Sequence, residues 1–367
     1  MNRLGRATIA VLAFASCRTP PGSSSPEWKL SETLRIGAEG RPETEFHRVA
    51  GAVRLANGEI AVADRGSNRV RYFGPDGTFR RSFGREGAGP GEFRSMGRLI
   101  RFGDTLAIHD LRNGRLTLFR SDSLLLTLTV RAANSTAHFS IDDRLADGRW
   151  LAGTAIAPRF STHPYRDSIA VGIFPASADG EVQLLRWFPG PWVVSIEGQL
   201  TGLAGFLTWV SSRAVGREIL VLDTDQERIR RFALDGTELP GAAIPVPGEP
   251  LTPDLIERAK RQETSGGLDS LLARKWLEAR YDPAVLPGRL PFRGFIADSD
   301  GLIWLEEYPV DHAPRQYFVL SPDGQLVAVV TAPAGFRATD IGPDYCLGVE
   351  TDPDGVERIA LYRLTRN

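Results

Sequence analysis

A three-residue pattern recurs along the chain at constant spacing. An aspartate is followed five residues later by an arginine, and four residues after that by a phenylalanine. Each copy follows a β-type run and contains an alternating run, which ends at a glycine turn in the first and third copies. The unit is therefore strand, connection, strand, and its repetition indicates a repeat architecture. The three copies are Asp64, Arg69 and Phe73; Asp110, Arg115 and Phe119; and Asp223, Arg228 and Phe232.

Turn glycines set the length of the repeat. One precedes the first β-type run of each repeat, and the first three are spaced 45 residues apart. Four strands per repeat, repeated six times, predict an all-β fold, a six-bladed β-propeller, because one four-stranded sheet cannot bury both of its faces alone. The glycines are Gly58, Gly103, Gly148, Gly216, Gly301 and Gly342.

Both ends of the repeat array need a special solution. The last repeat has strands at about 345–350 and 358–364 but no fourth strand before the end of the chain. Residues 30–36 form a β-capable run ahead of the first repeat. We expect this amino-terminal strand to become the outer strand of blade six and to close the ring, which removes an exposed edge.

A helical insertion of about residues 251–285 is expected between blades four and five. Thr252 or Asp254 can cap a first helix over 253–262, and a second helix is predicted over 268–280. The second helix carries an apolar stripe that has to cover another surface. The stripe consists of Leu268, Leu271, Leu272, Trp276 and Leu277.

The amino terminus has the composition of an export signal. Arg3 and Arg6 precede an uncharged run over 7–15, and Ser16 stands before Cys17. Residues 14–17, Phe-Ala-Ser-Cys, resemble the bacterial lipobox, and the resemblance implies cleavage before Cys17 and its lipidation. The following Pro/Ser/Gly-rich stretch is typical of a tether. The expected organisation is a signal peptide over 1–16, lipidated cysteine and tether over 17–27, and propeller over 28–367.

These segments place the protein in the cell envelope. We expect a periplasmic or outer-membrane lipoprotein that is held to the membrane through the lipid anchor at Cys17; a secreted protein is the alternative. The 44 basic and 45 acidic residues leave a net charge of -1, so the chain lacks the positive field that drives nucleic-acid binding. No nucleic-acid partner is expected, and the protein is expected to be a monomer.

The first repeat also resembles a known family. Its residues 58–70 read Gly-Glu-Ile-Ala-Val-Ala-Asp-Arg-Gly-Ser-Asn-Arg-Val, followed by Phe-Gly-Pro-Asp-Gly at 73–77 and Gly-Ala-Gly-Pro-Gly-Glu-Phe at 87–93. This stretch is similar to the NHL-repeat propellers. The resemblance implies a six-bladed propeller and does not imply one activity. The repeated aspartates are expected to accept backbone hydrogen bonds, with the arginine five residues on as a candidate partner.

Arginines that follow a phenylalanine at strand entries form a first candidate site. In a propeller these entries lie around one mouth of the channel, and guanidinium groups gathered there can bind a carboxylate, a sulfate or an acidic sugar. The alternative is that the repeat conserves the phenylalanine for packing between blades, and that the arginine beside it only reflects the arginine-rich composition of the chain. The candidate residues are Arg48, Arg94, Arg293 and Arg337.

Histidines form a second candidate site on the same face. His47 and His138 fall at strand entries, and His163 and His312 fall in connections between second and third strands. Neutral imidazoles gathered at the mouth could hold a divalent metal such as zinc or calcium. The alternative is scattered loop residues, because no metal-binding spacing such as His-Glu-x-x-His is present.

Two hypotheses about function follow. The first is an envelope propeller that binds a ligand or partner through its loop face, with no catalysis and no cofactor; the partner would be an anionic small molecule, a glycan or an envelope protein. The second is a metal-assisted lyase or hydrolase with histidines and carboxylates at the channel mouth. A purely structural role in an envelope assembly is a third possibility, which a broad apolar patch beside the helical insertion would favour.

Overall fold

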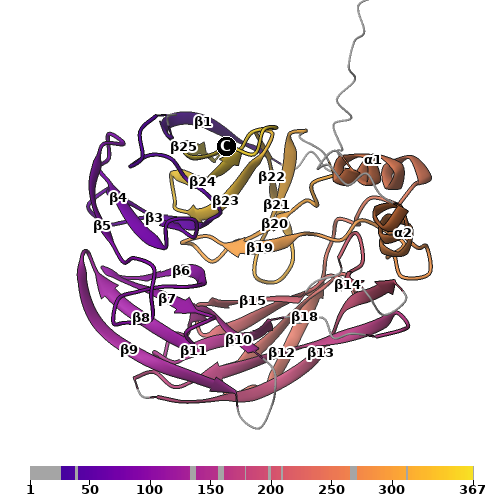
Figure 1. The fold of residues 1–367 in the computed structure, drawn as a ribbon, viewed down its shortest axis with the longest axis horizontal. Coiled ribbons are helices and arrows are strands. Elements are labelled where there is room, and N and C mark those ends of the chain that lie inside the picture. Colours follow the sequence, from indigo (N-terminus) through magenta and orange to yellow (C-terminus); the bar gives the residue numbers. More distant parts are fainter. Residues whose placement is uncertain are drawn as a thin grey trace, which may run out of the picture.

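The chain folds into four-stranded antiparallel sheets arranged around a central axis, which defines a β-propeller (Figure 1). The computed structural model describes residues 26–37, 40–132, 138–155, 161–177, 179–196, 200–207, 210–264, 271–310 and 313–366. Each four-stranded unit is called a blade below. The prediction of an almost entirely β fold is confirmed.

Consecutive strands pair with one another within each blade. The first blade contains β2 (Val49–Arg54), β3 (Ile60–Asp64), β4 (Arg69–Phe73) and β5 (Phe79–Phe83), and the second contains β6 (Met96–Phe102), β7 (Thr105–Asp110), β8 (Arg115–Arg120) and β9 (Ser123–Ala132). The third contains β10 (His138–Arg144), β11 (Trp150–Ala155), β12 (Tyr165–Phe174) and β13 (Gly180–Ile196), to which β14 (Leu200–Leu203) is added. The fourth contains β15 (Val210–Val215), β16 (Glu218–Asp223), β17 (Arg228–Ala233) and β18 (Glu238–Ala243), and the fifth contains β19 (Gly294–Ala297), β20 (Ile303–Glu306), β21 (Arg315–Leu320) and β22 (Leu326–Ala332).

The last blade is completed by the amino-terminal strand. Strands β23 (Phe336–Ile341), β24 (Tyr345–Thr351) and β25 (Glu357–Thr365) supply three strands, and β1 (Glu27–Ile36) pairs antiparallel with β25. Trp28 of β1 is buried, and its ring lies 5.9 Å from that of Trp304. The expected outer strand is therefore confirmed.

The helical insertion lies between β18 and β19, where it was expected. It contains α1 (Pro253–Thr264) and α2 (Leu271–Arg280), and neither is long and apolar enough to cross a membrane. Thr252 caps α1, because its Oγ1 accepts a hydrogen bond from the amide of Leu255 at 3.3 Å.

The apolar stripe predicted for the second helix is wrong in part. Leu271 and Leu272 are exposed, and α2 buries Ala273 and Leu277 instead. Leu268 lies outside the described residues. The helix packs beside β13 and β14, where Trp276 leaves no room for a side chain at Gly202. Only part of the stripe faces this narrow strand pair, so the first turn of α2 stays in water.

The repeated aspartates bind backbone amides, as expected. Asp64 is buried and accepts hydrogen bonds from the amides of His47 at 3.2 Å and Gly66 at 3.0 Å. Its ion-pair partner is Arg71 at 3.0 Å, whereas Arg69 is exposed. The predicted pairing with the arginine five residues on is therefore wrong for Asp64. Asp64 pairs instead with Arg71, the next arginine along β4 after Arg69.

Candidate functional site

Two adjacent cavities lie along the axis of the propeller, and they are called the upper and the lower cavity below. The upper cavity has a volume of about 200 Å³, and its lining includes Arg65, Glu306, Tyr317 and Arg337. The lower cavity has a volume of about 180 Å³, and its lining includes Arg101, Asp143, Arg213, Asp298 and Asp340. Arg98, Leu99, Ile296 and Thr339 line both cavities, so the two meet at these residues.

Bulges in the innermost strands decide which side chains reach the channel. The register of four innermost strands shifts at corresponding positions, which re-aims the residue at the shift. The residues at these shifts are Ala50 in β2, Gly97 and Arg98 in β6, Asp142 in β10 and Thr339 in β23. Ala50, Arg98 and Thr339 line the upper cavity.

Arg98 is the central charge of the channel. Its guanidinium has no hydrogen-bond or ion-pair partner within the part of the chain that the structure describes. Burial, together with the nearby charge of Arg213, lowers the pKa of Arg98 to about 10. Arg98 is partly buried, and a charge that is partly removed from water without a partner is unfavourable, so a bound anion would relieve this cost.

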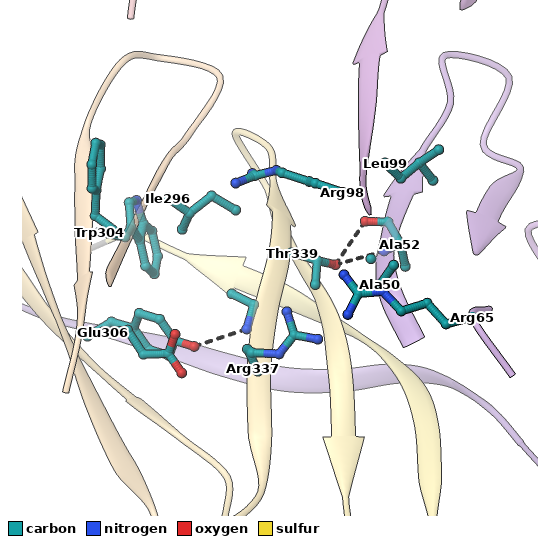
Figure 2. A pocket seen from close by; sticks show the side chains of 14 residues that line it. Ala50, Ala52, Arg65, Arg98, Leu99, Ile296, Trp304, Glu306, Arg337 and Thr339 are labelled. Carbon is teal, nitrogen blue, oxygen red and sulfur yellow. Dashed lines mark hydrogen bonds between the residues drawn. The ribbon is translucent and has the colours of Figure 1, made fainter. Parts of the chain in front are cut away.

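Arg65 and Arg337 add two guanidinium groups to the upper cavity, and Figure 2 shows all three arginines reaching toward one space. Arg65 donates through Nε to the carbonyl of Met96 at 2.7 Å. Arg337 donates through Nη2 to the carbonyl of Val49 at 3.3 Å. Burial and the charge of Arg337 lower the pKa of Arg65, as expected for cations held close together.

The four arginines predicted from sequence occupy different positions. Arg337 lines the upper cavity, whereas Arg48, Arg94 and Arg293 are exposed. Arg48 contributes to the lowered pKa of Arg65, and Arg293 contributes to the lowered pKa of Arg337, after burial in both cases. Arg293 also pairs with Glu306 at 3.3 Å. Three of the four therefore gather at this end of the channel.

The predicted histidines are only partly within the described residues. His47 and His163 are exposed, while His312 and the side chain of His138 lie outside the description. Among the described residues, no group of three or more His, Cys, Asp or Glu could hold a metal. The fifth histidine, His109, is buried, and its Nδ1 accepts the amide of Ile141 at 3.3 Å.

The carboxylates of the lower cavity already have partners. Asp340 pairs with Arg101 at 3.2 Å, and Asp298 pairs with Arg366 at 3.0 Å. Asp143 accepts a hydrogen bond from the amide of Ala214 at 3.1 Å. The lower cavity is therefore lined by charges of both signs, whereas three arginines face one glutamate in the upper cavity.

Asp142 gives the channel a measurable pH dependence. Burial raises the pKa of its carboxyl from 3.8 to about 6, with Arg213 and Arg98 opposing the shift. The folded state therefore holds this proton more tightly than the unfolded chain. The stabilisation is complete below pH 3.8 and is lost as the pH rises through 6.

The Asp142→Asn variant is accordingly expected to raise the free energy of unfolding at pH 8 by about 1 to 3 kcal/mol, with little effect near pH 3.5. Urea unfolding at the two pH values measures the difference. Asp122→Asn, at an exposed turn, is the control and should change stability little. An equal effect of Asp142→Asn at both pH values would contradict the assignment.

Arg65 and Arg98 were missed in the sequence. Arg65 directly follows the repeated Asp64, at the start of a connection between second and third strands. Arg98 and Arg101 are the two charged residues of an innermost strand whose other residues are apolar or glycine. A charged residue within an innermost strand is a signal in the sequence for a channel-lining position. The bulge that directs Arg98 inward cannot be recognised from the sequence pattern.

Fold and channel together define a β-propeller with a guanidinium-lined axial cavity. No protein-family model matches the chain, and no curated protein is significantly similar to it. Among solved structures it is similar to a putative exported protein from Bacteroides fragilis, with 12% identity, 92% of this chain and 96% of that chain covered, and a TM-score of 0.49.

Two further solved structures are similar at the same level. Regucalcin, a calcium-binding protein from Agrobacterium tumefaciens, has 14% identity, coverage of 94% of this chain and 97% of that chain, and a TM-score of 0.47. A catalytically inactive virginiamycin B lyase from Staphylococcus aureus, solved with quinupristin, has 10% identity, coverage of 92% and 100%, and a TM-score of 0.45. These values carry no information on the ligand or activity of this chain.

Proposed function

We propose that this protein is a six-bladed propeller of the cell envelope that binds a small anionic ligand in its upper cavity, without a covalent step. The observation that carries the proposal is Arg98, a guanidinium at the channel axis without a hydrogen-bond or ion-pair partner among the described residues. Arg65 and Arg337 add charge and further N–H groups beside it. Planar guanidinium groups favour carboxylate-like anions.

The size of the cavity limits the ligand. A volume of about 200 Å³ is small for a ligand pocket. This suits a small organic acid or a single sulfate better than a glycan chain. Arg48 and Arg293, exposed near the cavity arginines, would raise the local concentration of anions at the mouth. Arg94 belongs to the same proposal as an outer rim residue.

The envelope location rests on the amino-terminal sequence. The basic start, the apolar run and Cys17 are the features of an exported and lipidated chain. Labelling of growing cells with a palmitate analogue, with Cys17→Ser as control, tests the lipid anchor. The metal-dependent alternative at His47, His138, His163 and His312 stays a prediction, which elemental analysis of the purified protein would check.

The Arg98→Met variant is expected to weaken binding of small carboxylates at least tenfold, because it removes the central charge and keeps an apolar stem of similar length. Isothermal titration calorimetry with a panel of organic acids and sulfate measures this. The variant should fold at least as stably as the native chain, since an unpaired charge leaves the channel.

Two further variants make the result specific. Arg217→Met changes an exposed arginine on the turn between β15 and β16 and should leave affinity unchanged. Arg94→Ala distinguishes the contribution of the outer rim from that of the cavity and should reduce affinity less than twofold. If Arg98→Met binds every anion as well as the native chain does, the cavity is not the binding site.

A further inference from the structure

The upper cavity has two chemically different walls. Ile296 and Trp304 of the fifth blade lie on one side, above Glu306, which is paired with Arg315, and Arg65 lies on the other side (Figure 2). Arg98 and Arg337 stand between these two sides (Figure 2). A ligand that fills the cavity therefore contacts guanidinium groups at one end and apolar surface at the other.

The apolar wall is rigid. Trp304 is fully buried, and its indole Nε1 donates to Asp298 at 3.0 Å. Its ring packs against Tyr317, with 6.2 Å between centroids. Thr339 is likewise fixed, because its hydroxyl donates to the carbonyl of Ala52 at 2.8 Å (Figure 2). A wall of fixed aromatic and aliphatic groups favours a flat or branched apolar group over a hydrated ion.

The distribution of charge favours a single negative group. Arg65, Arg98 and Arg337 face the upper cavity, where Glu306, the one carboxylate among the described lining residues, is paired with Arg315 at 2.9 Å. A second anionic group extending past Arg98 would enter the lower cavity, which is lined by Asp143, Asp298 and Asp340. There it would meet carboxylates beside the cations Arg101 and Arg213, so this cavity offers it no net positive charge.

We infer that the ligand is a small monocarboxylate with an aromatic or branched aliphatic group, bound with the carboxylate on Arg98 and its neighbours and the apolar group against Ile296 and Trp304. This rests on the proposed function and specifies the chemical class of its ligand. Carboxylate and apolar group are both required, because each wall of the cavity satisfies only one of them.

The test is a calorimetric comparison of four ligands on the full chain. Benzoate carries both groups, acetate has only the carboxylate, benzamide has only the ring and a neutral amide, and terephthalate has two carboxylates. Benzoate is expected to bind at least tenfold more tightly than acetate, because the ring leaves water for the apolar wall. Its affinity is expected to exceed those of benzamide and terephthalate by a similar factor.

Two variants assign the preference to the two walls. Ile296→Ala should weaken benzoate about fivefold or more and leave acetate nearly unchanged, whereas Arg98→Met should weaken both. Ile296→Val, a smaller change on the same wall, is the second apolar variant if Ile296→Ala does not fold. Thermal unfolding of each variant without ligand separates loss of binding from loss of structure.

Each other outcome has a defined meaning. Equal binding of acetate and benzoate overturns the ligand class and leaves anion binding in place. Tighter binding of terephthalate overturns the requirement for a single charge. Equal binding of benzamide and benzoate, or no binding of any anion, overturns the proposed function as well.

Discussion

The Asp110→Ala variant is expected to lower the free energy of unfolding by about 3 to 5 kcal/mol. Asp110 is fully buried, and its carboxylate accepts hydrogen bonds from the amides of Arg94 at 2.6 Å, Ser95 at 3.1 Å and Arg112 at 3.1 Å, and from the amide and side chain of Asn113. Alanine leaves these donors without their acceptor. Because a typical domain is stable by about 5 to 15 kcal/mol, the variant approaches the limit of folding.

Urea denaturation measures the loss, with an unchanged m-value as evidence that the transition is still two-state. Asp104→Ala changes an exposed residue in the turn between β6 and β7 and is the matched control. Asp110→Asn keeps one acceptor oxygen and should fall between the native chain and the alanine variant. A loss below about 1 kcal/mol for Asp110→Ala would show that the repeated aspartate is not a structural anchor.

Removal of residues 1–36 is expected to prevent folding to a soluble monomer. Strand β1 pairs with β25 from Lys29 to Ile36 and with β22 at Glu27 and Trp28. Its loss exposes the edge of β25, a template for aggregation, and removes buried Trp28 and Ile36 from their cores. Size-exclusion chromatography and circular dichroism after expression measure the outcome.

A chain that lacks only residues 1–25 is the matched control, and it should fold as the native protein does. A synthetic peptide of residues 26–37, added during refolding to the chain without residues 1–36, should restore part of the native circular dichroism signal. The peptide can form the same strand pairing as β1, although from a separate molecule. If the chain without residues 1–36 folds and has the same unfolding temperature as the native protein, β1 does not close the ring.

Much of the fold follows from local pattern. Alternating runs such as those of β3 and β4, ended by glycine turns, appear as strands at the expected places. The helical insertion is predictable because 253–262 has helical spacing and a capping residue at Thr252 or Asp254; the observed helix extends to Thr264. The stripe predicted for the second helix is wrong at Leu271 and Leu272, because helical periodicity identifies an apolar face without specifying how wide the partner surface is.

The site was less accessible to sequence reasoning. Repeat equivalence directed attention to arginines at strand entries, and it reached Arg337 but also three residues that are exposed. Arg98 was missed, because its inward direction depends on the shift in register between β6 and β7. In a strand a one-residue change in register sends a side chain to the opposite face, so spacing alone does not identify channel residues.

The repeat, the turns, the helical insertion and the strand that completes the last blade are therefore predictable from local sequence, because each depends on apolar periodicity and short-range backbone preference. Only the tertiary structure decided that Arg65, Arg98 and Arg337 meet at the axis, opposite Ile296 and Trp304. These residues come from four different blades, and their approach depends on bulges and on the closure of the ring, which act over the whole chain.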